Sequence, residues 1–269
     1  MQPVKRRGFL RTAGAAALAS ACPAIATAMS RVPQPSISGG NGRPNILLIM
    51  TDQQHAGMLG CAGNPWLQSP ALDSLAARGV RFERAFCANP VCVPSRFTMF
   101  TGCMPSVIGM RGNGTRHITE IPAQIRAGGL GWLMRNAGYA TAYGGKQHLP
   151  KMRAEELGFD VISHDERDQL PDDCAAFLQR AHTQPFFLVA SFINPHDICY
   201  MAIRAFGATP MERMLLEKGT VELATLDRAL QCPADVSDDE FFAKYCPPLP
   251  PNFEVQDDEP EAITRMQAG

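Results

Sequence analysis

The sequence predicts an α/β fold in which a mostly parallel sheet is sandwiched by helices. Two almost entirely apolar runs, residues 44–50 and 185–193, have strand length and are typical of strands buried on both faces. Helix signals alternate with strand signals between these runs, which favours a doubly wound parallel arrangement. The chain has 269 residues, of which 45% are hydrophobic, so it can bury a sizeable core.

The next two elements of this pattern are a helix and a strand between residues 69 and 86. A helix is expected over residues 69–79, because Ser69 suits the N-cap, Pro70 the first helical position and Gly79 the end. Residues 80–86 alternate between apolar and polar side chains and predict a strand.

The middle of the chain repeats the alternation. Residues 94–102 predict a helix that ends at a glycine, and residues 121–138 contain another. Residues 139–146 predict a strand and a turn, and residues 166–183 contain a helix that leads into the second apolar run. The pattern becomes irregular after residue 200, and the proline-rich, acidic residues 246–269 predict an extended surface segment.

The N-terminal 28 residues predict a signal peptide of the twin-arginine type. The pair Arg6-Arg7 precedes a mild, alanine-rich apolar run and an A-x-A pattern at residues 26–28. Residues 29–43 are rich in Pro, Gly and Ser and predict a linker. We therefore expect export by the twin-arginine machinery to the periplasm or beyond, with lipid attachment at Cys22 as a minor alternative.

Composition excludes several classes of partner. The chain carries 25 basic and 26 acidic residues without a basic block outside the N-terminus, so we expect no nucleic-acid partner. No later apolar run reaches the length of a transmembrane helix, so we expect no membrane span after removal of the signal. The nine cysteines are irregularly spaced, and we expect most of them to be buried thiols rather than disulfides.

Polar clusters stand at the ends of the predicted strands. They are Asp52-Gln53, residues 145–148 and residues 194–197, and a fourth group stands at Cys92, where a helix begins. The carboxyl ends of parallel strands meet at one edge of a sheet, so these four groups can share one crevice. Together they offer a carboxylate, an amide, a thiol, cationic side chains and imidazoles, which suits a divalent cation and a tetrahedral oxyanion.

Cys92 by itself admits two ordinary interpretations. It is a buried structural thiol, or it is a thiolate activated by the helix N-terminus and Arg96. Neither interpretation explains why Pro94, Ser95 and Arg96 accompany it.

The stretch Cys92 to Arg96, "CVPSR", resembles the C-x-P-S-R signature of the sulfatase family, within the alkaline-phosphatase-like superfamily. Four further blocks resemble the same family in the same order: "RPNILLIMTDQQ", "SPALDSLAARGVRFERAF", "GKQH" and "NPHD". The resemblance covers residues 43 to about 260.

This resemblance implies a sulfuric ester hydrolase. In the family, a formylglycine-generating enzyme oxidises the signature cysteine to Cα-formylglycine, whose hydrate attacks the sulfur of a sulfate ester beside Ca²⁺ or Mg²⁺. The expected substrate is a sulfate-ester small molecule or a sulfated glycan. The signature residues Pro94 and Arg96 are then explained as the recognition signal for oxidation of Cys92.

The family pattern assigns a role to individual positions. Asp52 matches the first metal carboxylate, and Cys92, as formylglycine, completes the metal site on the nucleophile side. Gln53 stands where the family usually has a second aspartate, so the site carries one negative charge less.

The remaining carried-over residues handle the sulfate and the protons. Arg96 is expected to hold the diol, and Lys146 to neutralise a sulfate oxygen. His148 is expected to bond the diol and take its proton, and His196 to lie near the bridging oxygen as a sulfate ligand or leaving-group acid.

The later Asp-His or Asp-Asn pair of the family's metal site has no match after residue 200. We therefore expect residues 44–269 to be an incomplete N-terminal catalytic domain, truncated at its C-terminus. Two alternatives to the sulfatase stay open: a phosphonate or phosphate monoester hydrolase of the same superfamily, and a catalytically inactive remnant.

Overall fold

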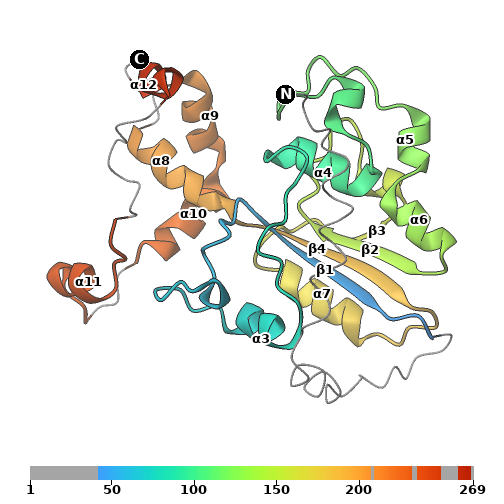
Figure 1. Cartoon of the computed structure of the whole chain (residues 1–269), viewed down its shortest axis with the longest axis horizontal. Coiled ribbons are helices and arrows are strands. Elements are labelled where there is room, and N and C mark those ends of the chain that lie inside the picture. Colours follow the sequence, from blue (N-terminus) through green and yellow to red (C-terminus); the bar gives the residue numbers. More distant parts are fainter. Residues whose placement is uncertain (1–41, 207–208, 232–234, 250–259, 268–269) are drawn as a thin grey trace, which may run out of the picture. The chain divides into compact units, whose positions relative to one another are not determined.

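The computed structural model describes residues 42–206, 209–231, 235–249 and 260–267 (Figure 1). The chain divides into two compact units at Pro44, and the elements below belong to the second, Asn45–Gly269. The predicted signal peptide and nearly all of the predicted linker lie outside the described residues. No helix of the described residues is both long and apolar enough to cross a membrane.

Among the described residues, the centre of the second unit is a parallel sheet of four strands in the order β1-β4-β2-β3. The strands are β1 (Ile46–Asp52), β2 (Ala140–Gly145), β3 (Asp160–Ser163) and β4 (Phe186–Pro195). All three neighbouring pairs run parallel, so the carboxyl ends lie along one edge. The predicted α/β class and parallel sheet are confirmed, whereas the four-residue strand β3 was not predicted.

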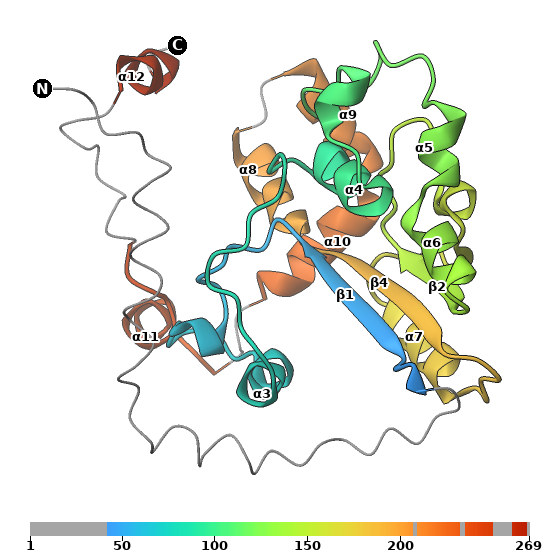
Figure 2. The ribbon, with the colours of Figure 1, turned by 45° about the vertical axis from the view of Figure 1, so that its right-hand side comes forward.

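Helices cover both faces of this sheet (Figures 1 and 2). On one face, α4 (Cys92–Thr101), α5 (Ala123–Ala127) and α6 (Leu130–Asn136) enclose a core whose buried members include Phe97, Phe100, Tyr143 and Val189. On the other face, α7 (Leu170–Gln179) packs on a second core around Leu188. The predicted helix within 121–138 is therefore two helices, because Gly128 and Gly129 interrupt it.

The first strand is covered on one face only, which corrects the expectation of burial on both. Its side chains alternate between half-buried and exposed, and Leu47 and Ile49 are 43% and 47% exposed. Leu47 pairs in register with Leu188, which is fully buried. The difference arises because α7 packs on β2, β3 and β4, while β1 lies at the edge of the described sheet.

The predicted strand over residues 80–86 is wrong. The segment is irregular and pairs with no strand of the described chain, and Val80, Phe82 and Phe86 are largely exposed. Alternation creates an apolar face, but a strand also needs a neighbouring edge for its backbone hydrogen bonds.

The predicted helix over 69–79 is confirmed as α3 (Pro70–Arg78), with Pro70 in the first turn and Gly79 after the end. The Ser69 hydroxyl does not cap this helix; it donates to the Asp73 carboxylate and accepts from the Gly60 backbone N–H. The Ser69 hydroxyl therefore holds the preceding short 3-10 turn, η3 (Gly60–Ala62), against α3. Two further 3-10 turns, η4 (Pro105–Ile108) and η5 (Ala154–Leu157), lie in the connections.

Most of the described chain after residue 200 is helical, so the expectation of an irregular pattern there is wrong. The helices are α8 (Cys199–Phe206), α9 (Pro210–Lys218), α10 (Thr220–Ala229), α11 (Asp238–Lys244) and α12 (Glu261–Gln267). Thr209 and Glu212 form a capping box at the start of α9. This T-x-x-E spacing was a visible helix signal. Of the predicted extended segment 246–269, residues 246–249 belong to no helix or strand, residues 250–259 lie outside the described residues, and α12 contradicts the prediction at its end.

A partly buried ion-pair network connects these helices to the sheet. Arg167, in the loop after β3, donates to both oxygens of Asp197 at 2.8 and 3.0 Å and to Glu222 at 2.8 Å. Asp197 belongs to the 3-10 turn η6 (His196–Ile198), and Glu222 belongs to α10. One guanidinium therefore joins the β3–α7 loop, the turn at the end of β4 and a later helix.

The uneven cover of β1 predicts unequal losses of stability for two leucines that lie side by side in register, Leu47 and Leu188. Leu188→Ala should lower the free energy of unfolding by about 2–5 kcal/mol, because it empties a packed site under α7. Leu47→Ala should cost less than about 1 kcal/mol, because its side chain already meets solvent. Urea unfolding of both variants checks this, and similar losses would mean that Leu47 is covered in solution.

The network around Arg167 predicts a large loss of stability on truncation. Arg167→Ala should lower the free energy of unfolding by about 3–5 kcal/mol, since it leaves the buried Asp197 carboxylate without its cation. The matched control is Arg228→Ala, which removes an exposed pair with Asp168 and should cost less than about 1 kcal/mol. Thermal and urea unfolding measure both, and equal effects would contradict the assignment.

Candidate active site at the carboxyl ends of the strands

The site is organised around the carboxylate of Asp52, the last residue of β1, which is buried. Its Oδ2 accepts from Arg96 Nη2 at 3.0 Å and from Lys146 Nζ at 2.9 Å. Burial by itself raises the pKa of Asp52, but the hydrogen bonds and charges of Lys146 and Arg96 outweigh burial and lower it. One buried anion is therefore held ionised by two cations.

Arg96 connects three elements from its position on α4, with its side chain only 3% exposed. Besides Asp52, its Nη1 donates to the Lys146 carbonyl and to the Ser191 hydroxyl, both at 2.7 Å. The same Lys146 carbonyl also accepts from the hydroxyls of Tyr143 and Ser191. The end of β2 is thus fixed to α4 and β4 by hydrogen bonds that converge on one peptide oxygen.

Cys92 is the first residue of α4, so the helix begins two residues before the predicted start at Pro94. Its Sγ lies 3.7 Å from Asp52 Oδ1 and 3.9 Å from Asn113 Nδ2. Asn113 Oδ1 also accepts the backbone N–H of Val93 at 3.0 Å, which satisfies one free donor of the helix start. Sequence reasoning missed Asn113, because it lies 21 residues away and no local pattern marks it.

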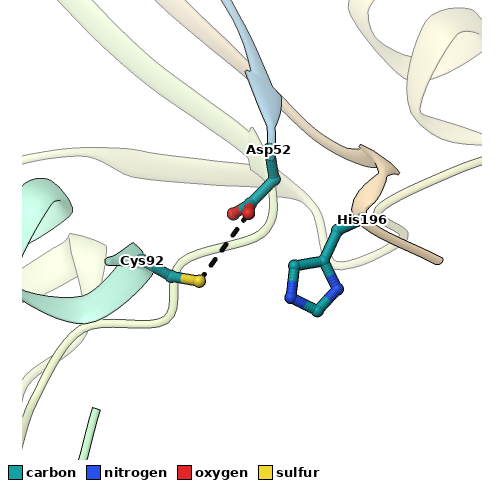
Figure 3. A group of neighbouring side chains, drawn as sticks. All are labelled: Asp52, Cys92 and His196. Atoms are coloured by element: carbon teal, nitrogen blue, oxygen red, sulfur yellow. Dashed lines mark hydrogen bonds between the residues drawn. The ribbon is translucent and has the colours of Figure 1, made fainter. Parts of the chain in front are cut away.

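His196 opens the turn η6 after β4 and completes a group of possible metal ligands. Donor atoms of Asp52, Cys92 and His196 all lie within 4.8 Å of one another. Nδ1 of His196 is 3.8 Å from Cys199 Sγ, and Figure 3 shows the other ring nitrogen, Nε2, turned toward Asp52 and Cys92. Burial, followed by the charge of Lys146, lowers the pKa of His196, so its imidazole is neutral at pH 7.

The other two predicted site residues, Gln53 and His148, lie shortly after the ends of β1 and β2, and both have an unusual backbone conformation. Gln53 (φ 60°) and His148 (φ 44°) are non-glycine residues in the left-handed region, and such conformations gather at functional sites. Burial, and then the charges of Lys146 and Arg96, lower the pKa of His148. The Gln53 side chain is exposed. Of the seven predicted positions, five therefore lie in one connected cluster: Asp52, Cys92, Arg96, Lys146 and His196.

The grouped donor atoms do not by themselves make a site for a hard cation. Ca²⁺ takes six to eight oxygen ligands, whereas this group offers a sulfur, a nitrogen and a carboxylate. Oδ2 of that carboxylate already accepts from Arg96 and Lys146. The described residues thus fit Ca²⁺ only poorly.

The cysteines are less buried than expected. The described residues hold seven free cysteines and no disulfide, and of these only Cys174 is buried. Cys87 is exposed, and Cys92 and Cys199 are half-buried at the site.

Comparison with known proteins assigns this sequence to a family. The family model described as Sulfatase matches residues 44–210. The chain is 39% identical over 107 residues to a protein of Escherichia coli named uncharacterized sulfatase YidJ. It is 42% identical over 113 residues to steryl-sulfatase of Mus musculus. Among solved structures, a 2-O GAG sulfatase is similar at 27% identity with a TM-score of 0.51.

The similarity covers only part of each relative. It spans 40% of this chain and 20% of the Escherichia coli protein, 39% and 18% for the mouse enzyme, and 58% and 36% for the solved structure. The family match nevertheless extends over more than half of the chain and includes the strand ends and the helix start described above. On this match, and on a fold that agrees with it, the chain belongs to the sulfatase family.

Proposed function

We propose that this chain is a sulfuric ester hydrolase whose nucleophile is a formylglycine made from Cys92. The observation that carries the proposal is the cluster in which Cys92 and His196 meet Asp52, itself bonded to Arg96 and Lys146. Four elements distant in sequence supply these groups at one edge of the sheet. The Cys92 Sγ stands in for the oxygen that a hydrated formylglycine carries at the same position.

The signature residues are buried in the fold, which bears on when oxidation can occur. Pro94 is fully buried and Arg96 is 3% exposed, with its guanidinium bonded to three partners. A formylglycine-generating enzyme that recognises this sequence therefore needs it before the domain has folded. Because a twin-arginine substrate is exported folded, we place the oxidation before export to the periplasm or beyond.

A hydrated formylglycine supplies an oxygen nucleophile for the sulfur of the ester. The chain's own residues then manage charge and protons around that position. Lys146 Nζ would neutralise a sulfate oxygen, and the Arg96 guanidinium would hold the diol and offset the charge that develops on it. His148 and His196 have lowered pKa values and are neutral at pH 7. His148 accepts a proton from the diol as its oxygen bonds to sulfur. The bond from sulfur to the bridging oxygen breaks, and His196 lies at that oxygen as a sulfate ligand or as the acid that protonates the leaving alcohol.

The proposal includes the cation of the family, Ca²⁺ or Mg²⁺, only as an ion that this site would bind. Asp52, Gln53 and position 92 would hold it, but these residues offer fewer oxygens than Ca²⁺ takes. We therefore assign no step of the reaction to it.

The substrate class is a sulfate ester, either a small molecule or a sulfated glycan. The relatives bear names as different as steryl-sulfatase and 2-O GAG sulfatase, so the core shared with them does not select between these substrates. Pocket residues outside the shared core must make that selection.

The proposal is tested by producing the chain with and without a formylglycine-generating enzyme. Mass spectrometry of the peptide that contains position 92 should show conversion of CH₂SH to CHO only with that enzyme. Only the converted chain should release sulfate from an aryl sulfate. Absence of conversion, or preference for an aryl phosphonate or phosphate ester, would overturn the sulfatase assignment, and conversion without turnover would mark an inactive remnant.

Lys146 provides the sharpest mutational prediction for the reaction. Lys146→Ala should lower kcat/KM for an aryl sulfate about 10²- to 10³-fold, because it removes a preorganised cation from the developing charge. Arg96 still pairs with Asp52 in this variant, so the fold should persist. Lys244→Ala, which removes an exposed lysine on α11, should leave kcat/KM unchanged. Steady-state kinetics with circular dichroism decides, and equal activities of the two variants would exclude the role.

A further inference from the structure

We propose that the chain in which Cys92 has not been converted binds Zn²⁺ through Cys92 Sγ, His196 Nε2 and Asp52 Oδ1. These atoms come from three different elements: the start of α4, the turn η6 and the end of β1. The set of one thiolate, one imidazole and one carboxylate is a ligand set of zinc proteins, in which three protein ligands leave a fourth position open. The proposal concerns the chain as translated and does not depend on turnover of a sulfate ester.

The separations between the atoms are close to those that tetrahedral zinc requires. Zinc–ligand distances of about 2.3 Å to sulfur and 2.0–2.2 Å to nitrogen or oxygen place two ligands about 3.5 Å apart. Cys92 Sγ lies 3.7 Å from Asp52 Oδ1, and the third ligand atom lies within 4.8 Å of both. Figure 3 shows Nε2 of His196 on the side that faces this pair. A rotation of one imidazole about its side-chain bonds would close the group.

The surroundings hold each ligand in an orientation that suits binding. Arg96 and Lys146 both bond to Oδ2 of Asp52, which leaves Oδ1 for the metal. Asn113 fixes the helix start beside Cys92. Partners of this kind orient metal ligands and contribute to affinity.

The nature of the donors decides which metal is preferred. Thiolate and imidazole favour zinc, whereas Ca²⁺ and Mg²⁺ favour oxygen. On binding, the Cys92 thiol loses its proton to solvent and the sulfur–zinc bond forms, with no change in oxidation state. The nearby charges of Lys146 and Arg96 oppose a divalent cation, so we expect weaker binding than in a four-ligand structural zinc site. Conversion of Cys92 to formylglycine removes the sulfur and with it the zinc site.

Titration of the full-length, unconverted chain with Co²⁺ tests the proposal. We expect one equivalent of Co²⁺ to give a thiolate-to-metal charge-transfer absorption, which Zn²⁺ abolishes by displacement and Ca²⁺ in large excess does not. Cys92→Ser should abolish the absorption, and His196→Ala should weaken Zn²⁺ binding more than about 100-fold, beyond the usual cost of losing an outer-shell partner. Cys87→Ser removes an exposed thiol elsewhere and should change neither quantity.

The converted chain gives a second comparison that needs no substitution. The same sequence with formylglycine at position 92 should lose the Co²⁺ absorption while keeping its circular dichroism spectrum, whether or not it hydrolyses sulfate esters. Persistence of the absorption in Cys92→Ser or in the converted chain would overturn the proposal. So would its loss in Cys199→Ser alone, because the sulfur ligand would then be Cys199, or displacement of the metal by Ca²⁺.

Discussion

The buried carboxylate of Asp52, with Arg96 and Lys146 on the same oxygen, fixes the geometry of everything around it. It attaches the end of β1 to α4 and to the end of β2, and Arg96 extends the connection to β4 through Ser191. Desolvating three charges is costly, and apolar replacements of such clusters are often as stable or more so. The cluster is therefore better explained by its electrostatic potential. Two cations and one anion leave a net positive charge at this edge of the sheet, where an anionic substrate would lie.

Under the two proposals above, that same edge serves two kinds of chemistry, and position 92 decides between them. With sulfur at this position, the nearest donors form a mixed sulfur, nitrogen and oxygen set around Asp52 and His196. With the proposed hydrated aldehyde, the set would become one of oxygens and cations suited to ester hydrolysis. The same surrounding residues would line the site in both cases, so on these proposals a single oxidation changes what the site binds.

The sequence predicts those parts of the structure that depend on local signals. Strands β1, β2 and β4 and helices α3, α4 and α7 follow from apolar runs, prolines and glycines, and the clustering of Asp52 with Cys92 follows from the rule that parallel strands end at one edge. Features that depend on distant partners could not be predicted. Residues 80–86 have a strand-like pattern but no pairing edge, Leu47 is exposed because α7 stops short of β1, and Asn113 reaches the helix start only through the tertiary fold.

The incomplete cover of β1 also bears on how the chain behaves at high concentration. In the described part of the chain, β1 is the outer strand of the sheet, with Leu47 and Ile49 turned to water. An outer strand with apolar side chains and unsatisfied backbone groups is a template for intermolecular pairing. Self-association by this route would leave the pairing of β1 with β4 and the site around Asp52 intact. Purified material could therefore become turbid without losing the ability to bind ligands.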